Sequence, residues 1–221
     1  NVNAFVDLLK LAKIKCAKMI YASSGATYGN TPSPQTIGVE NPQNVYGFSK
    51  LMMDNIARVY AKRYNMSIIG LRYFNVYGAR EFFKEKTASM VLQLGLQILS
   101  GKPPRLFFES DKILRDFIYI EDIVQANILA IKAKKSGVYN VGTSKPRSFQ
   151  DIADILQKEL KTAYKTEYFE NPHKAYQTHT EANIASTCEE LGFEPKFSLE
   201  DGIKDYVPEI KRVYESEIKN V

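Results

Sequence analysis

Apolar positions along the chain alternate between short runs and longer stretches with helical spacing. This spacing predicts a helix over residues 5–14, and the apolar run at residues 19–22 follows at once as a buried strand. A turn-rich segment, residues 23–42, separates this strand from a helix that we expect to end near Tyr64. Strands and helices in alternation are typical of an α/β protein with a parallel sheet.

The same alternation continues towards the end of the chain. Further strands are predicted at residues 67–72, 117–120, 138–141 and, more briefly, 166–169. A helix over residues 123–133 lies between two of them, and this order predicts a right-handed βαβ crossover. After Phe149 amphipathic helices dominate, at residues 149–160, 181–191 and 199–214. The C-terminal part is therefore expected to form a smaller, α-rich lobe.

Composition and charge narrow the range of partners. The chain has 221 residues, of which 44% are apolar, so it can bury a substantial core. Its net charge of +5 could indicate nucleic-acid binding, but basic residues are interleaved with acidic ones, as in residues 84–86, and we expect no nucleic-acid partner. No run approaches the roughly 18 apolar residues of a membrane span, and residues 1–5 lack the layout of a signal peptide. We expect a soluble, cytoplasmic protein without a membrane partner.

Cysteines and histidines are few and widely spaced. Cys16 and Cys188 have no CxxC spacing, so we expect no disulfide framework. His173 and His179 are the only histidines, and they are neither three nor four residues apart. We therefore expect no dedicated metal site.

A tyrosine and a lysine near the start of the long helix form the first candidate for chemistry. Tyr46 and Lys50 are four residues apart and share one helix face. Tyrosine ionises only near about pH 10, and an adjacent ammonium favours the phenolate that acid–base work requires. The spacing alone also arises by chance on surface helices. Ser24 strengthens it, because it ends the first predicted strand, and ligands of open α/β sheets gather at the carboxyl ends of strands.

Four segments in order carry a resemblance to a known family: residues 21–29, 44–50, 71–78 and 115–122. Together they resemble the extended short-chain dehydrogenase/reductase family. The resemblance implies a Rossmann-like, doubly wound parallel sheet with a smaller α-rich C-terminal substrate lobe. Residues 1–148 would be the C-terminal part of the dinucleotide-binding domain, with substrate-lobe insertions around residues 79–115. Residues 149–221 would mostly form the substrate-binding lobe.

Residues 78–90 and 175–178 are similar to family members that invert C6 of ADP-D-glycero-D-manno-heptose. This implies an isomerase that uses bound NADP, with NAD possible, and supplies heptose for the lipopolysaccharide inner core. It also implies a homo-oligomer, a pentamer by resemblance. Dehydratases of the family carry an Asp–Glu pair after the serine, whereas Gly25 and Ala26 stand here, which argues against 4,6-dehydration. Another nucleotide-sugar 4-epimerase and a cofactor-free sugar-nucleotide-binding module remain as alternatives.

The resemblance also assigns roles to individual residues. The catalytic residues would be Ser24, Tyr46, Lys50 and Lys84, with Tyr46 and Lys84 as the two acid–base groups that an inversion requires. The cofactor would contact Asn1, Tyr46, Lys50, Val76 and Lys84. The substrate would contact Ser24, Asn75, Lys86, Gln93, Phe107, Phe108, Glu109, Ser110, Arg115 and Tyr176. The planar guanidinium of Arg115 suits a diphosphate, and the alternative is a surface Arg–Asp pair. For Lys84 the alternative is a solvated loop.

The glycine-rich loop of a dinucleotide site is missing from this sequence. Such a site needs closely spaced glycines after the first strand, so that backbone amides can approach the pyrophosphate. The twelve glycines of the chain are never two or three residues apart. We therefore expect an incomplete sheet that lacks its first βα units, on the order of 80 residues, and a chain that is an inactive fragment of an enzyme.

Overall fold

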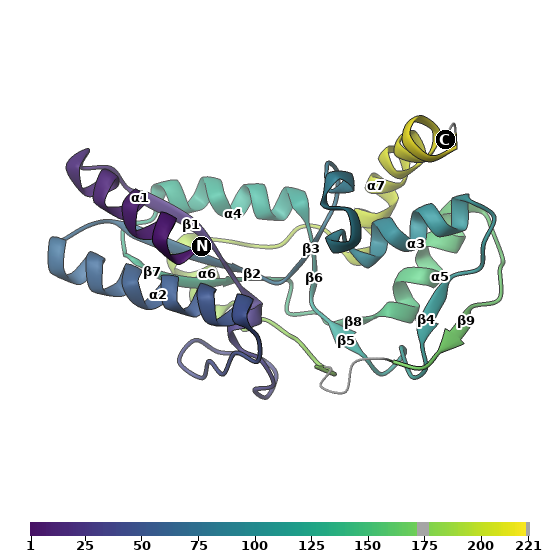
Figure 1. Ribbon diagram of the computed structural model, residues 1–221, viewed down its shortest axis with the longest axis horizontal. Coiled ribbons are helices and arrows are strands. Elements are labelled where there is room, and N and C mark those ends of the chain that lie inside the picture. Colours follow the sequence, from purple (N-terminus) through teal and green to yellow (C-terminus); the bar gives the residue numbers. More distant parts are fainter. Residues whose placement is uncertain (172–176, 220–221) are drawn as a thin grey trace.

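The computed structural model describes residues 1–171 and 177–219. Its main sheet has three parallel strands, β1 (Met19–Ser24), β2 (Ile68–Tyr73) and β7 (Gly137–Val141), in the order β1-β2-β7. Figure 1 shows this sheet running between helices α4 and α2. Strand β1 forms one edge of the sheet.

Helices cover both faces of this sheet, because successive strand residues point to opposite sides. Helices α1 (Val2–Ile14) and α2 (Val45–Tyr64) share a core with Tyr21 and Ile68 on one face. Helices α4 (Ile120–Lys132) and α6 (Ala185–Leu191) share a core with Ile69, Leu71 and Val141 on the other. This doubly wound arrangement confirms the predicted fold class.

A second lobe is built around helices α3 (Met90–Leu99), α5 (Phe149–Leu160) and α7 (Leu199–Val213), whose apolar faces share one core. Three short strand pairs accompany them: β3 (Asn75–Tyr77) with β6 (Phe117–Tyr119), β4 (Arg105–Phe107) with β9 (Glu167–Phe169), and β5 (Leu114–Arg115) with β8 (Arg147–Ser148). In Figure 1, α3, α5, β4 and β9 lie at the end of the molecule opposite α1. The residue boundaries of the two units stay a prediction.

The predicted βαβ crossover over residues 117–141 is wrong. Strand β6 pairs with β3, whereas β7 pairs with β2. The reason lies at Phe74, between β2 and β3. Its backbone N–H donates to Val141 of β7, whereas the next residue, Asn75, donates to Asp116 before β6. The chain therefore exchanges one neighbouring strand for the other at this point.

The helix predicted at residues 181–191 begins later than expected, at Ala185. The preceding residues are extended and bond to the buried Gln35. Gln35 donates its backbone N–H to Glu181 and accepts from the N–H of Asn183. These pairings hold residues 181–183 outside the helix. Among the described residues, no helix is long and apolar enough to cross a membrane.

Candidate active site

The carboxyl end of β1 positions Ser24 at the start of a short 3-10 turn, η1 (Gly25–Thr27). Ser24 lies opposite Tyr73, the last residue of β2, in the strand register. Its Oγ accepts a hydrogen bond from the backbone N–H of Ala26 at 3.1 Å. Within the described part of the chain no group accepts the Ser24 hydroxyl proton, so this hydroxyl can still donate to a ligand.

The first two turns of α2 bring Tyr46 and Lys50 to the same place. The Asn44 side chain caps the helix by accepting from the N–H of Gly47 at 2.8 Å. Tyr46 is 51% exposed, whereas Lys50 is half-buried and donates from Nζ to the carbonyl oxygen of Ala22 at 2.7 Å. The Lys50 Nζ lies 5.7 Å from the centre of the Tyr46 ring. The Lys50 hydrogen bond therefore fixes the start of α2, which also carries Tyr46, against the strand that ends at Ser24.

Asp54 and Asn1 affect the surroundings of Lys50. Burial lowers the pKa of the Lys50 ammonium, and the negative charge of Asp54, one turn further along α2, opposes that shift. Asn1 donates from its side-chain amide to the hydroxyl of Ser49 at 3.0 Å. The predicted cofactor residue Asn1 thus contacts the residue next to Lys50.

Gly47 allows α2 to approach the turn after Ser24. A Cβ at Gly47 would lie 2.4 Å from the carbonyl oxygen of Ala26, which is closer than packed atoms allow. We expect Gly47→Ala to lower the free energy of unfolding by about 1–3 kcal/mol in a urea titration, because helix or turn must shift. Gly25→Ala is the matched control, since the atoms nearest its Cβ would be those of the Phe74 ring, at the ordinary contact distance of 3.5 Å. Equal stability of the two variants would contradict this assignment.

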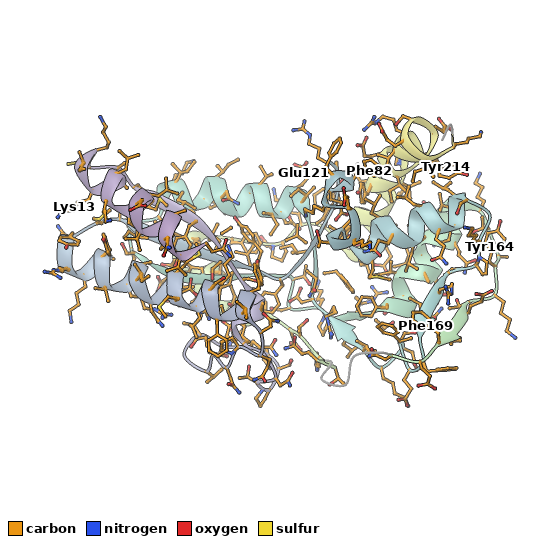
Figure 2. The ribbon with its side chains drawn as sticks, viewed as in Figure 1. Lys13, Phe82, Glu121, Tyr164, Phe169 and Tyr214 are labelled. Carbon is orange, nitrogen blue, oxygen red and sulfur yellow. The ribbon has the colours of Figure 1, made fainter. Side chains whose placement is uncertain are left out.

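Lys84 is on a different element from Tyr46 and Lys50. It belongs to the exposed 3-10 turn η2 (Phe82–Thr87), where its N–H donates to Glu81 at 2.9 Å and its carbonyl accepts from Thr87 at 2.7 Å. Figure 2 labels Phe82 of this turn beside α7, in the second lobe. Among the described residues, no contact joins Lys84 to the serine, tyrosine or first lysine of the candidate site. Its predicted roles therefore stay predictions.

A cavity of ≈ 330 Å³ opens in the second lobe. It is lined by Met90, Gln93, Leu94, Gln97, Arg105, Leu106, Phe107, Ser110, Phe149 and Phe169. Three of these, Gln93, Phe107 and Ser110, are predicted substrate residues. The Oγ of Ser110 is buried and has no hydrogen-bond partner among the described residues, so it can bond to a bound molecule. The Phe107 and Phe169 rings meet edge to face, with centres 4.9 Å apart.

Several residues of this cavity, among them Arg105, Phe149 and Phe169, were not predicted from the sequence. Phe169 is labelled in Figure 2, at the end of β9 beneath the helices of the second lobe. It reaches the cavity because β9 pairs with β4, so that Phe169 lies opposite Phe107. The short strand at residues 166–169 was predicted, but periodicity carries no information about its partner.

The remaining predicted substrate and cofactor residues are spread around these two places. Arg115 is buried over the Phe149 ring at 5.8 Å and donates to the carbonyls of Leu114 (2.8 Å) and Gln177. The other predicted residues are placed as follows: Asn75 donates to the Asp116 carbonyl, Val76 packs on the core beneath α4, and Lys86, Phe108 and Glu109 are exposed. Tyr176 lies outside the described residues.

The residues at the end of β1 fit the nicotinamide half of a dinucleotide. A hydroxyl, a phenol and an ammonium gather at the carboxyl ends of parallel strands, which is where open α/β sheets bind such cofactors. Of these residues, Tyr46 and Lys50 are the predicted cofactor contacts that would hold it, whereas Ser24 is predicted to contact the substrate. The diphosphate half needs a glycine-rich turn, and none occurs in this sequence.

Comparison with known proteins identifies relatives of this chain. The model of the NAD dependent epimerase/dehydratase family matches residues 1–142. The chain is similar to the solved ADP-L-glycero-D-manno-heptose-6-epimerase of Helicobacter pylori, with 51% identity and a TM-score of 0.88. That match covers 95% of this chain and 65% of the Helicobacter chain, so the chain spans less than two thirds of that relative.

Two 4-epimerases match at lower identity. The UDP-glucose 4-epimerase of Thermotoga maritima, solved with UDP-glucose, is 26% identical with a TM-score of 0.87, over 95% of this chain and 68% of that one. The UDP-glucuronic acid 4-epimerase of Bacillus cereus, solved with UDP-glucuronic acid and NAD, is 28% identical with a TM-score of 0.85, over 96% and 68%. These matches confirm the resemblance inferred from the four motifs. The chain belongs to the NAD dependent epimerase/dehydratase family.

Proposed function

We propose that the complete protein inverts C6 of ADP-D-glycero-D-manno-heptose with bound NADP. The observation that carries this is the placement of Tyr46 and Lys50 beside the strand that ends at Ser24, in a chain 51% identical to a heptose epimerase. When bound, the nicotinamide supplies the oxidation of the sugar alcohol and its re-reduction from the opposite face. The proposal includes a cytoplasmic homo-oligomer, a pentamer by resemblance, that serves lipopolysaccharide synthesis.

The residues of this chain would move and hold the proton. Ser24 donates a hydrogen bond to the sugar oxygen, and Tyr46 takes the hydroxyl proton as the carbonyl forms. The Lys50 ammonium stabilises the negative charge on the Tyr46 oxygen, and the Ala22 carbonyl holds it in place. On the return step a proton must reach the oxygen from a different direction, because the carbon is inverted. Lys84 is the proposed second acid–base group for that step.

The second-lobe cavity is the proposed place of the nucleotide part of the substrate. Its lining is mostly apolar and aromatic, and it includes the buried hydroxyl of Ser110 and the amide of Gln93. A mainly apolar lining with a few polar groups is typical of ligand pockets. The Gln93 amide donates to the Ala88 carbonyl at 2.6 Å, which leaves its oxygen for a ligand.

A UDP-sugar 4-epimerase is the second candidate, because 4-epimerases match over nearly the whole chain. The experiment that separates the two offers the complete protein ADP-D-glycero-D-manno-heptose and, separately, UDP-glucose and UDP-N-acetylglucosamine. Conversion of the ADP-heptose alone supports the proposal. Turnover of a UDP-hexose without conversion of the heptose would replace it with the second candidate.

The 221-residue chain by itself is proposed to be inactive and to bind NADP too weakly to measure. The reason is that none of its glycines are spaced to let backbone amides approach a pyrophosphate. Calorimetric titration of the chain with NADP, and with NAD in parallel, tests this prediction. Heat of binding that saturates at micromolar concentration would show that another part of this chain holds the cofactor.

A further inference from the structure

A buried carboxylate lies directly behind the candidate site. Asp54 is in α2 and is fully buried. Together with Tyr46 and Lys50 it forms a row with a spacing of four residues, so the three side chains follow one face of the helix. The proposed chemistry uses the first two and leaves Asp54 without a role.

Among the described residues, the hydrogen bonds to Asp54 come from the two strands beside α2. The carboxylate accepts from Tyr21 at 2.8 Å and from Ser23 at 3.0 Å, both on β1. It also accepts from Nε and one terminal nitrogen of Arg72 on β2, at 2.9 and 2.8 Å. Three of the four bonds fall on one oxygen, Oδ2, and the guanidinium supplies the opposite charge that a buried carboxylate requires.

The backbone is adapted to this arrangement at Gly70. A Cβ there would lie 2.5 Å from the Tyr21 hydroxyl, so only glycine leaves room for the tyrosine to reach Asp54. Arg72 is itself fully buried, lies 4.9 Å over the Tyr28 ring and forms a second ion pair, with Glu40, at 2.6 Å.

The donors to Asp54 are the neighbours of the site residues. Ser23 immediately precedes Ser24, and Arg72 lies opposite Ser23 in the strand register. A shift of the Asp54 carboxylate would therefore move α2, and with it Tyr46 and Lys50, relative to the end of β1. A misplacement of about 1 Å can cost on the order of 10²-fold in rate.

We propose that Asp54 is a positioning residue, which fixes the helix of Tyr46 and Lys50 against the strand of Ser24 and places a negative charge behind the Lys50 ammonium. This inference rests on the proposed function, because it concerns the rate of that reaction. A buried ion pair adds little to stability compared with apolar residues of the same volume. A contribution to folding stability therefore does not by itself explain why Asp54 and Arg72 are paired in the core.

The charge of Asp54 also acts on Lys50. Burial lowers the pKa of Lys50, and Asp54 opposes this. Removing the charge therefore lowers that pKa further, and the ammonium is lost at a lower pH. The titratable groups around Asp54 are Tyr21 from β1, Arg72 from β2, Arg58 and Lys50 from α2 itself, and Glu40, which reaches the same arginine from the loop before α2.

The experiment compares Asp54→Asn with Glu40→Gln in the complete protein. Both variants remove a carboxylate from Arg72, but only Asp54 also bonds to Ser23 and Tyr21. For Asp54→Asn we expect kcat to fall about 10- to 100-fold with KM within about 3-fold, and the alkaline limb of the kcat profile to move to lower pH. For Glu40→Gln we expect a lower melting temperature, kcat within about 3-fold, and an unmoved limb. Equal losses of kcat with unmoved limbs would overturn the proposal.

A second measurement does not depend on the substrate. Heteronuclear NMR of the Lys50 side chain should show its ammonium titrating at lower pH in Asp54→Asn than in the wild type and in Glu40→Gln. An unmoved titration in an active enzyme overturns the inference. A moved titration in a protein that epimerises no nucleotide sugar instead rejects the proposed function. If Asp54→Asn fails to fold, Ser23→Ala takes its place, because it removes one of the hydrogen bonds to Asp54. We then expect kcat to fall about 3- to 10-fold. An unchanged kcat would overturn the proposal.

Discussion

Tyr46→Phe should reduce kcat of the complete protein by about 10²-fold or more, with little change in the affinity for the nucleotide sugar. The substitution removes only the phenolic oxygen from a ring in the first turn of α2, whose centre lies 5.7 Å from the Lys50 Nζ. Without that oxygen no group of the described site takes the hydroxyl proton at the end of β1. Steady-state kinetics with the ADP-heptose, together with substrate binding by calorimetry, measure the two effects separately.

Tyr60→Phe provides the control for this result. Tyr60 lies on the same helix, fourteen residues further along, and packs edge to face on Tyr64 with ring centres 5.2 Å apart. We expect its kcat to remain within about 2-fold of the wild type. A Tyr46→Phe enzyme as active as this control would remove Tyr46 from the chemistry.

Lys84→Met should cause a loss of similar size, about 10²-fold in kcat, if this lysine is the second acid–base group. Lys84 lies in the exposed turn η2, so a loss of this size would show that its side chain reaches the substrate. Backbone conformations just before and within the turn are unusual, since Arg80 and Glu85 have φ values of 72° and 50°. Such conformations are concentrated at sites where backbone moves or strain is used.

An exposed lysine elsewhere in the second lobe gives the comparison for Lys84. Lys102→Met, in the loop after α3, removes the same charge from the protein and should leave kcat within about 2-fold of the wild type. Near-normal epimerisation by Lys84→Met would show that Lys84 is a solvated surface residue without a role in the reaction. Epimerisation would then depend on Tyr46 as its one acid–base group from this chain.

The sequence predicted the part of the site that lies within one βα unit. Ser24, Tyr46 and Lys50 are separated by at most 26 residues. A strand, a turn and a helix follow in that order, and this local arrangement places the three residues near one another independently of the rest of the fold. The cap at Asn44 and the close approach at Gly47 refine this local arrangement without altering it. Hydrophobic periodicity was therefore sufficient to place these three residues on neighbouring elements, whereas their catalytic roles rest on the resemblance and stay predictions.

The features that were missed depend on pairing between distant segments. The cavity requires β4 to meet β9 across 60 residues, and the exchange of strand partners at Phe74 requires both Val141 and Asp116. Periodicity reports which face of an element is buried but not which element covers it. One signal for the Asp54 network was present in the sequence, because Arg72 interrupts the apolar residues of β2 at a buried position. A buried charge in a parallel strand requires a partner.

In the proposed reaction, the site at the end of β1 inverts its substrate by oxidation and re-reduction at one carbon. The most direct test gives the complete protein ADP-D-glycero-D-manno-heptose carrying deuterium at C6, in ordinary water, and measures deuterium in the product by mass spectrometry. Hydrogen that leaves C6 and returns to it without exchange gives a product that keeps its deuterium, which is the result we predict. Product that has exchanged its deuterium for solvent hydrogen would contradict the account, since it would show proton abstraction from carbon instead.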